Sequence, residues 1–125
     1  MIYLDTHVAI WLYAGKLDLI SPNARQAMED EPELLISPMV LLELDFLYEI
    51  ERIRVDSDRI GTYLNQKIGL AVCDKSFELV CKTAAKQQWT RDPFDRLITA
   101  QAAIASNGLI TKDRIIHEYY PQALW

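Results

Sequence analysis

The sequence predicts an α/β domain with a mainly parallel central sheet flanked by helices. Short apolar segments, typical of buried strands, alternate along the chain with longer segments that carry helix start and stop signals. The chain has 125 residues, half of them hydrophobic, which is enough for one domain with its own core. We find no internal repeat, low-complexity segment or linker. We therefore expect a single domain over residues 1–125.

The chain begins with a predicted buried strand over residues 1–4, followed by a helix over residues 6–14 that Gly15 ends. Asp5 lies between them, at the carboxyl end of the strand. An aspartate in this position can simply cap the helix. It can also face a ligand, because open parallel α/β sheets bind ligands outside the carboxyl ends of their strands.

Serine-proline pairs mark the next two helices. Ser21 and Pro22 supply a cap and a first helical residue, which predicts a helix to about Asp30. A compact strand is expected at residues 34–36. Ser37-Pro38 repeats the start signal and predicts a helix that runs to about Arg52.

The middle of the chain continues the alternation. Residues 53–55 are expected to be a short extended segment, and Ser57 or Asp58 to cap a helix that ends near Gln66. Residues 70–73 are a strand candidate. Ser76 then caps a helix to about Gln88, with a buried face formed by Phe77, Val80, Cys81, Ala84 and Ala85.

The last third opens with Asp92 as a helix cap and Pro93 as the first helical residue, which places Asp95 at the third helical position. This helix is apolar almost all round, so we expect it to be central, and Asn107-Gly108 to end it. A strand over residues 109–111 follows. The tail is expected to form a short helix, a proline break and a final apolar strand.

Four acidic residues stand out by position. Asp5 and Asp113 follow strands, Asp95 lies at a helix entrance, where the helix dipole favours its charge, and Glu43 lies on an apolar helix face. That face is predicted from Val40, Leu47 and Ile50. A carboxylate there loses hydration unless a cation or donors compensate, so Glu43 needs a partner. A buried salt bridge, or a rotation that lets Glu43 reach water, would also satisfy it.

One oxygen-lined metal site explains all four acids together. Carboxylates without histidine or cysteine favour Mg²⁺ or Mn²⁺ over Zn²⁺. These ions commonly meet phosphate oxygens, so the implied reaction is phosphodiester hydrolysis. We assign neither His7 nor His117 to the site. Asp45, Glu49 and Glu51 are expected to be surface charges.

The composition sets limits on location and partners. The chain lacks an apolar run long enough to span a bilayer and a signal sequence at its start, so we expect a soluble cytoplasmic protein. Cys73 and Cys81 are expected to be reduced, buried thiols. The formal net charge of −5 opposes nucleic-acid binding by charge alone. Bound dications would invert the field at the acidic site and attract phosphate.

Several segments together resemble the PIN domain family, and more narrowly its VapC-type toxin ribonucleases. They are LDTH at residues 4–7, SPMVLLEL with Glu43, RDPFDRLITAQA at residues 91–102, and LITKD at residues 109–113. DTH alone is a weak signal and LITKD a moderate one. DPFDR followed by an apolar LITAQA helix is specific, and the resemblance covers essentially the whole chain.

The resemblance implies a single PIN-like domain and a Mg²⁺- or Mn²⁺-dependent endoribonuclease, the toxin of a type II toxin-antitoxin pair. It implies an RNA substrate, a homodimer, and inhibition by a small antitoxin protein that covers the acidic groove. Asp5, Glu43, Asp95 and Asp113 fall on the family's metal-binding, catalytic acids. Asp92 falls on an accessory acid or cap, and Thr111 on a polar position beside the last acid.

Three other readings remain at this point. The chain could be a PIN-like nuclease that processes RNA or DNA without an antitoxin, or a catalytically silent binding module whose acids are structural. A flavodoxin-like receiver domain also gathers acids at strand ends, but this chain has only one early acid, Asp5. Arg91, Arg96, Lys112 and Arg114 are near the acids in sequence and could contact phosphate, although surface ion pairing is the simpler expectation.

Overall fold

The computed structural model describes all 125 residues and contains one five-stranded sheet. All its strand pairs are parallel, as the sequence predicts, and the strand order is β3-β2-β1-β4-β5. A flavodoxin-like sheet places β1 between β2 and β3, so this order excludes the receiver alternative. The strands are β1 (Ile2–Leu4), β2 (Leu34–Ile36), β3 (Ala71–Val72), β4 (Gly108–Ile110) and β5 (Ala123–Leu124).

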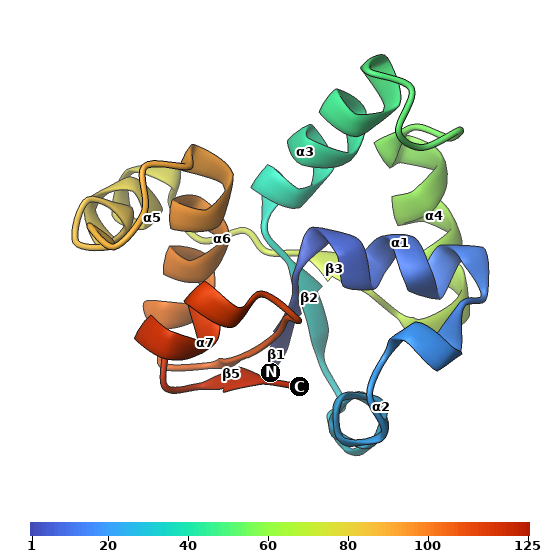
Figure 1. Ribbon diagram of the computed structural model, residues 1–125, viewed down its shortest axis with the longest axis horizontal. Helices are drawn as coiled ribbons and strands as arrows, with labels where there is room; N and C mark the ends of the chain where they lie inside the picture. Colours follow the sequence, from blue (N-terminus) through green and yellow to red (C-terminus); the bar gives the residue numbers. More distant parts are fainter.

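Helices cover both faces of the sheet. In Figure 1, α5, α6 and α7 lie to one side of β1 and β2, and α1, α2 and α4 lie to the other. Helix α3 packs against α1, α4 and α6. The helices are α1 (Thr6–Ala14), α2 (Pro22–Asp30), α3 (Pro38–Glu49), α4 (Ser57–Ile68), α5 (Phe77–Ala84), α6 (Pro93–Ala103) and α7 (Arg114–Tyr119), with a short 3-10 turn at Leu17–Leu19.

Most of the predicted helix starts are confirmed. The side chains of Ser21, Ser37, Ser76 and Asp92 each accept a hydrogen bond from a backbone N–H in the first turn of the following helix. These contacts satisfy donors that would otherwise lack a partner. At the other end of α1, Gly15 adopts a φ of 71°, which glycine reaches without steric cost.

The segment between α3 and α4 differs from the prediction. Helix α3 ends at Glu49, three residues early, because Ile50 caps it and Glu51 turns the chain with a φ of 62°. Residues 53–55 form bends and join no strand. The cap of α4 is Asp56, whose carboxylate accepts a hydrogen bond from the N–H of Arg59.

Helix α5 is shorter and less buried than expected. It ends at Ala84, and the predicted face is wrong for two of its members, since Phe77 is 69% exposed and Ala85 is also exposed. The reason is that α5 packs mainly on α6, so only a narrow stripe, Val80 and Ala84, is buried against Ala100.

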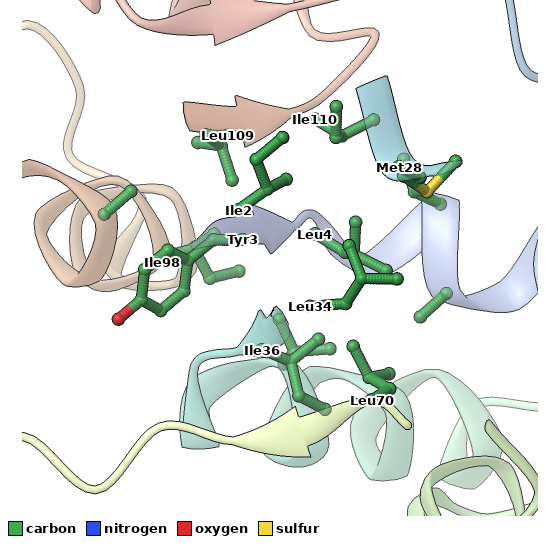
Figure 2. Packing of buried hydrophobic residues seen from close by; sticks show 14 of the residues in the cluster. Ile2, Tyr3, Leu4, Met28, Leu34, Ile36, Leu70, Ile98, Leu109 and Ile110 are labelled. Carbon is green, nitrogen blue, oxygen red and sulfur yellow. The ribbon is translucent and has the colours of Figure 1, made fainter. Parts of the chain in front are cut away.

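The main core surrounds β1, which is central in the sheet. Figure 2 shows Tyr3 and Leu4 among side chains from the neighbouring strands and helices. Helix α6 contributes Ile98 and Ala102, both almost fully buried, which confirms its predicted central position. This packing fixes β1 and α6, the two elements that carry Asp5 and Asp95.

The two cysteines are free. Cys73 is buried, as expected, whereas Cys81 is only partly covered because it lies at the edge of the α5 contact stripe. None of the helices is both long and apolar enough to cross a membrane.

Candidate functional site

Two of the four acids are brought together by the strand register. Leu4 of β1 pairs with Ile110 of β4, so the residues that follow these strands emerge at the same edge of the sheet. The backbone N–H of Asp5 donates to the carbonyl oxygen of Ile110 at 3.0 Å. Asp113 lies three residues beyond Ile110, where the chain turns from β4 into α7.

The other two acids reach the same place from helices. Helices α3 and α6 pack against each other above the carboxyl ends of the strands, and they carry Glu43 and Asp95. The structure therefore brings the four acids into one hollow of about 270 Å³. The residues that line it are Asp5, His7, Trp11, Glu43, Asp95, Lys112 and Asp113.

Two fully buried threonines hold Asp5 in position. The hydroxyl of Thr111 donates to Oδ2 of Asp5 at 2.6 Å, and the backbone N–H of Thr6 donates to Oδ1 at 2.8 Å. The hydroxyl oxygen of Thr111 also accepts from the N–H of Asp113 at 3.1 Å. Thr111 thus connects the two acids that follow strands.

Glu43 has a hydrogen-bond partner that the sequence did not indicate. Its carboxylate accepts from the hydroxyl of Thr6, and neither of the two ion pairs in the structure involves it. The apolar face predicted for α3 is partly wrong. Val40 and Leu44 are fully buried whereas Ile50 is 46% exposed, which leaves Glu43 half-buried at the edge of the core.

Burial raises the pKa of three of the acids. It raises the pKa of Asp5 and Glu43 above the usual range, although hydrogen bonds from Thr111 and Thr6 oppose the shift. Asp95 has no such donor. Burial, reinforced by the charges of Asp92 and Asp113, raises the pKa of Asp95 to about 7. None of the carboxylates in this hollow forms an ion pair with a lysine or arginine.

Asp92 and Asp113 both cap helices. Oδ1 of Asp113 accepts from the N–H groups of the second and third residues of α7, at 2.8 and 3.1 Å. Asp92 does the same for α6, at 2.8 and 3.2 Å, and its carboxylate is exposed and outside the hollow. Asp92 was expected to be either an accessory acid or a helix cap, and in the structure it caps α6.

One wall of the hollow was not predicted from the sequence. His7, which was not assigned to the site, lines the hollow together with Trp11 and Lys112. A signal was present, because His7 and Trp11 are four residues apart on α1 and therefore share a face that begins two residues after Asp5. Lys112 precedes Asp113 and takes part in neither ion pair, contrary to the expected surface pairing.

The arginines near the site donate hydrogen bonds to backbone carbonyls or are exposed to solvent. Nε of Arg96 donates to the carbonyl of Thr90 at 2.7 Å, and Nη1 of Arg91 donates to the carbonyl of Gln88 at 3.1 Å. The surface ion pairs expected for these arginines and for Arg114 are absent. The Arg91 and Arg96 contacts instead stabilise the loop that leads into α6.

The residues fit a hard divalent cation by the chemistry of their donors. The acids at the hollow offer only oxygen ligands, and no lysine or arginine neutralises them. As the side chains stand, no three His, Cys, Asp or Glu residues converge closely enough to hold one ion. The carboxylates of Asp5, Glu43 and Asp113 accept hydrogen bonds from threonine or backbone donors instead.

Comparison with known proteins identifies relatives over the whole chain. The family model described as PIN domain matches residues 2–120. Ribonuclease VapC22 of Mycobacterium tuberculosis is 31% identical over 132 residues, which cover 99% of this chain and 98% of that protein.

Two solved structures share the fold at 20% sequence identity. One is a toxin-antitoxin complex from Klebsiella pneumoniae, with a TM-score of 0.68 over 98% of this chain and 95% of that chain. The other is a DNA-bound VapBC from Salmonella typhimurium, with a TM-score of 0.63 over 98% of this chain and 93% of that chain. These likenesses bear on the fold alone.

Proposed function

The chain belongs to the PIN domain family, and we propose that it is a metal-dependent endoribonuclease that acts as the toxin of a type II toxin-antitoxin pair. The observation that carries the proposal is the hollow, where acids from two strand ends and two helices meet without a cationic partner. A relative of nearly equal length is named a ribonuclease, which supports RNA as the substrate.

In this proposal Asp5, Glu43, Asp95 and Asp113 are the catalytic residues and hold Mg²⁺ or Mn²⁺. When bound, the metal supplies activation of water and neutralisation of charge at the scissile phosphate. The chain supplies the arrangement of the donors. Thr111 and Thr6 fix the carboxylate of Asp5, and rigid donors of this kind reduce the cost of ordering a site.

The proposed partners follow from the family and from two fold relatives that are named as toxin-antitoxin or VapBC complexes. We propose that a cognate antitoxin covers the hollow, that the chain forms a homodimer, and that it acts in the cytoplasm, where RNA is available.

The test is cleavage by the purified chain. It is incubated with single-stranded RNA and with single-stranded DNA, in Mn²⁺ and in a chelator, beside an Asp5→Asn variant. We expect cleavage of RNA in Mn²⁺ only, and loss of at least about 100-fold in rate for the variant, because the site loses a charged ligand. Cleavage of DNA alone would refute the proposal, and so would full metal-dependent activity of Asp5→Asn.

A further inference from the structure

The wall of the hollow that faces the acids is aromatic and basic. It consists of His7 and Trp11, both on α1, and of Lys112, which follows β4. We call these three residues the α1 wall. An acidic metal site requires only the carboxylates, so the α1 wall calls for a separate explanation.

Trp11 is partly buried and packs against the core. Trp125 lies beside it, with 6.0 Å between ring centroids and 57° between planes. The ring of His7 lies 6.0 Å from Trp11 at 50° and is exposed to the hollow. Because the two rings are tilted by 50°, they offer two separate faces rather than one flat surface, and a base can stack on one of them.

Lys112 adds an available positive charge. Its Nζ lies 6.0 Å from the ring centroid of Trp11, its side chain is exposed, and no carboxylate pairs with it. A lysine ammonium in this state can contact a phosphate oxygen without first breaking an ion pair. The α1 wall thus combines stacking rings with a phosphate contact at the edge of the acids.

We propose that the α1 wall binds one unstacked nucleotide of single-stranded RNA, with its base stacked on the ring of Trp11 beside His7 and a phosphate near Lys112. The inference deepens the proposed ribonuclease function and rests on it. Single-stranded RNA is recognised largely by bases that stack on aromatic side chains, histidine and tryptophan included. A hollow of about 270 Å³ has room for one such base.

The proposal also accounts for RNA binding by an acidic protein. The formal net charge of −5 opposes affinity that depends on charge. Stacking depends on the contact between a base and a ring, so it contributes affinity that this charge does not cancel. The base contact would then hold a substrate that the net charge of the chain otherwise repels.

The test measures binding of a fluorescein-labelled single-stranded RNA by anisotropy, in Mn²⁺, to an Asp95→Asn chain that leaves the RNA intact. Single bases are removed in turn along the RNA. We expect one abasic position to weaken binding by about 5- to 150-fold, which corresponds to the 1–3 kcal/mol typical of one base–aromatic stack. Adding Trp11→Leu to this chain should weaken binding of the intact RNA by a similar factor. Removing the base at the position found in the scan should then weaken binding no further.

Two variants control for a general loss of structure. Trp11→Phe keeps a ring and should retain the abasic effect. Trp89→Leu removes a tryptophan that also packs against the core but lies outside the hollow, stacked on Tyr119 at 5.6 Å. It should leave both the affinity and the abasic effect unchanged. The abasic effect is a ratio within one variant, so partial unfolding does not alter it.

Lys112→Ala tests the phosphate contact. Each lost contact to single-stranded nucleic acid reduces the slope of log affinity against log salt by about 0.7. We expect that reduction for Lys112→Ala and none for Lys82→Ala, whose ammonium is paired with Glu78 on α5.

An abasic effect of equal size with and without Trp11 would overturn the proposal, as would unchanged affinity in Trp11→Leu. Cleavage by the wild-type chain is measured in parallel. A chain that cleaves RNA but shows no dependence on Trp11 retains the proposed function and loses the α1 wall contact. A chain that shows the dependence but cleaves no RNA supports the contact and counts against the proposed function.

Discussion

At the scale of single residues, the carboxyl of Asp95 has the least favourable environment among the acids. Its pKa lies near 7 in the metal-free chain, against 3.8 in the unfolded chain, because of burial and the neighbouring charges of Asp92 and Asp113. The folded chain therefore keeps this proton to a higher pH than the unfolded chain. Its stability should fall as the pH rises from about 4 to 7.

Replacing Asp95 with Asn should remove this penalty. In the absence of metal we expect Asp95→Asn to raise the melting temperature at pH 8 by about 3–6 °C, which corresponds to a gain of about 1 kcal/mol in the free energy of unfolding. At pH 4.5 the melting temperature should change little. Asp58→Asn is the matched control, since Asp58 lies in the first turn of α4 but is exposed. A melting temperature that is lower at pH 8 for Asp95→Asn would contradict the account.

Thr111 should matter through its hydroxyl. Its side chain is fully buried, donates to Asp5 and accepts from the N–H of Asp113. Thr111→Val keeps the shape but removes the donor to Oδ2 of Asp5 and the acceptor for the N–H of Asp113, so we expect a loss of about 1–3 kcal/mol in the free energy of unfolding. Urea denaturation measures this loss in the free energy of unfolding. Thr111→Ser should lose less than half as much, and equal losses would show that packing rather than the hydroxyl is responsible.

At the scale of elements, one acid that was expected to be a surface charge joins two helices. Oδ1 of Asp45 on α3 accepts from the N–H of Ser57, and Oδ2 accepts from its hydroxyl, both at 2.8 Å. This correction follows from the turn between the helices, which brings Ser57 back to α3. Asp45 therefore stabilises the α3–α4 pair, and through it the helix that carries Glu43.

Asp45→Ala should weaken folding and leave the chemistry intact. We expect a loss of about 1–3 kcal/mol in the free energy of unfolding, because two donors of Ser57 lose their acceptor. The RNA cleavage rate per folded molecule should stay within about twofold of wild type, in contrast to Asp5→Asn. Glu49→Ala, an exposed residue of the same helix, is the control. A large loss of rate in Asp45→Ala would place that acid in the site.

Local signals predicted most of the elements. Caps such as Ser37 and Asp92 and stop residues such as Gly15 depend on neighbours in sequence, so the helix starts could be deduced. The end of α3 and the narrow buried stripe of α5 could not. They depend on what each helix packs against, and this is set by the tertiary fold.

At the scale of the whole molecule, the sheet edge explains why four distant acids meet. Parallel strands place Asp5 and Asp113 at the same edge, and the packing of α3 on α6 brings Glu43 and Asp95 above it. The sequence indicated each acid by its place in an element. The resemblance pointed to Thr111, but nothing in the sequence indicated Thr6 as a donor to Glu43 or Lys112 as a neighbour of Trp11, because those contacts cross between elements far apart in the chain.

The assembled hollow should bind metal more tightly as the pH rises. The ion must displace the proton that Asp95 holds with a pKa near 7, so we expect the affinity for Mn²⁺ to increase by up to about tenfold per unit between pH 5.5 and 7. Isothermal titration calorimetry measures it, and the variant Asp95→Asn should show a flatter profile. An affinity independent of pH in the wild-type chain would argue against binding at Asp95.

The location of the metal tests the central claim most directly. Crystals of the chain are soaked in Mn²⁺ and an anomalous difference map is recorded at the manganese absorption edge. The account predicts one or two peaks inside the hollow, at coordination distance, roughly 2.0–2.3 Å, from a carboxylate oxygen of Asp5 and of at least one of Glu43, Asp95 and Asp113. Fully occupied peaks elsewhere, with none in the hollow, would contradict it.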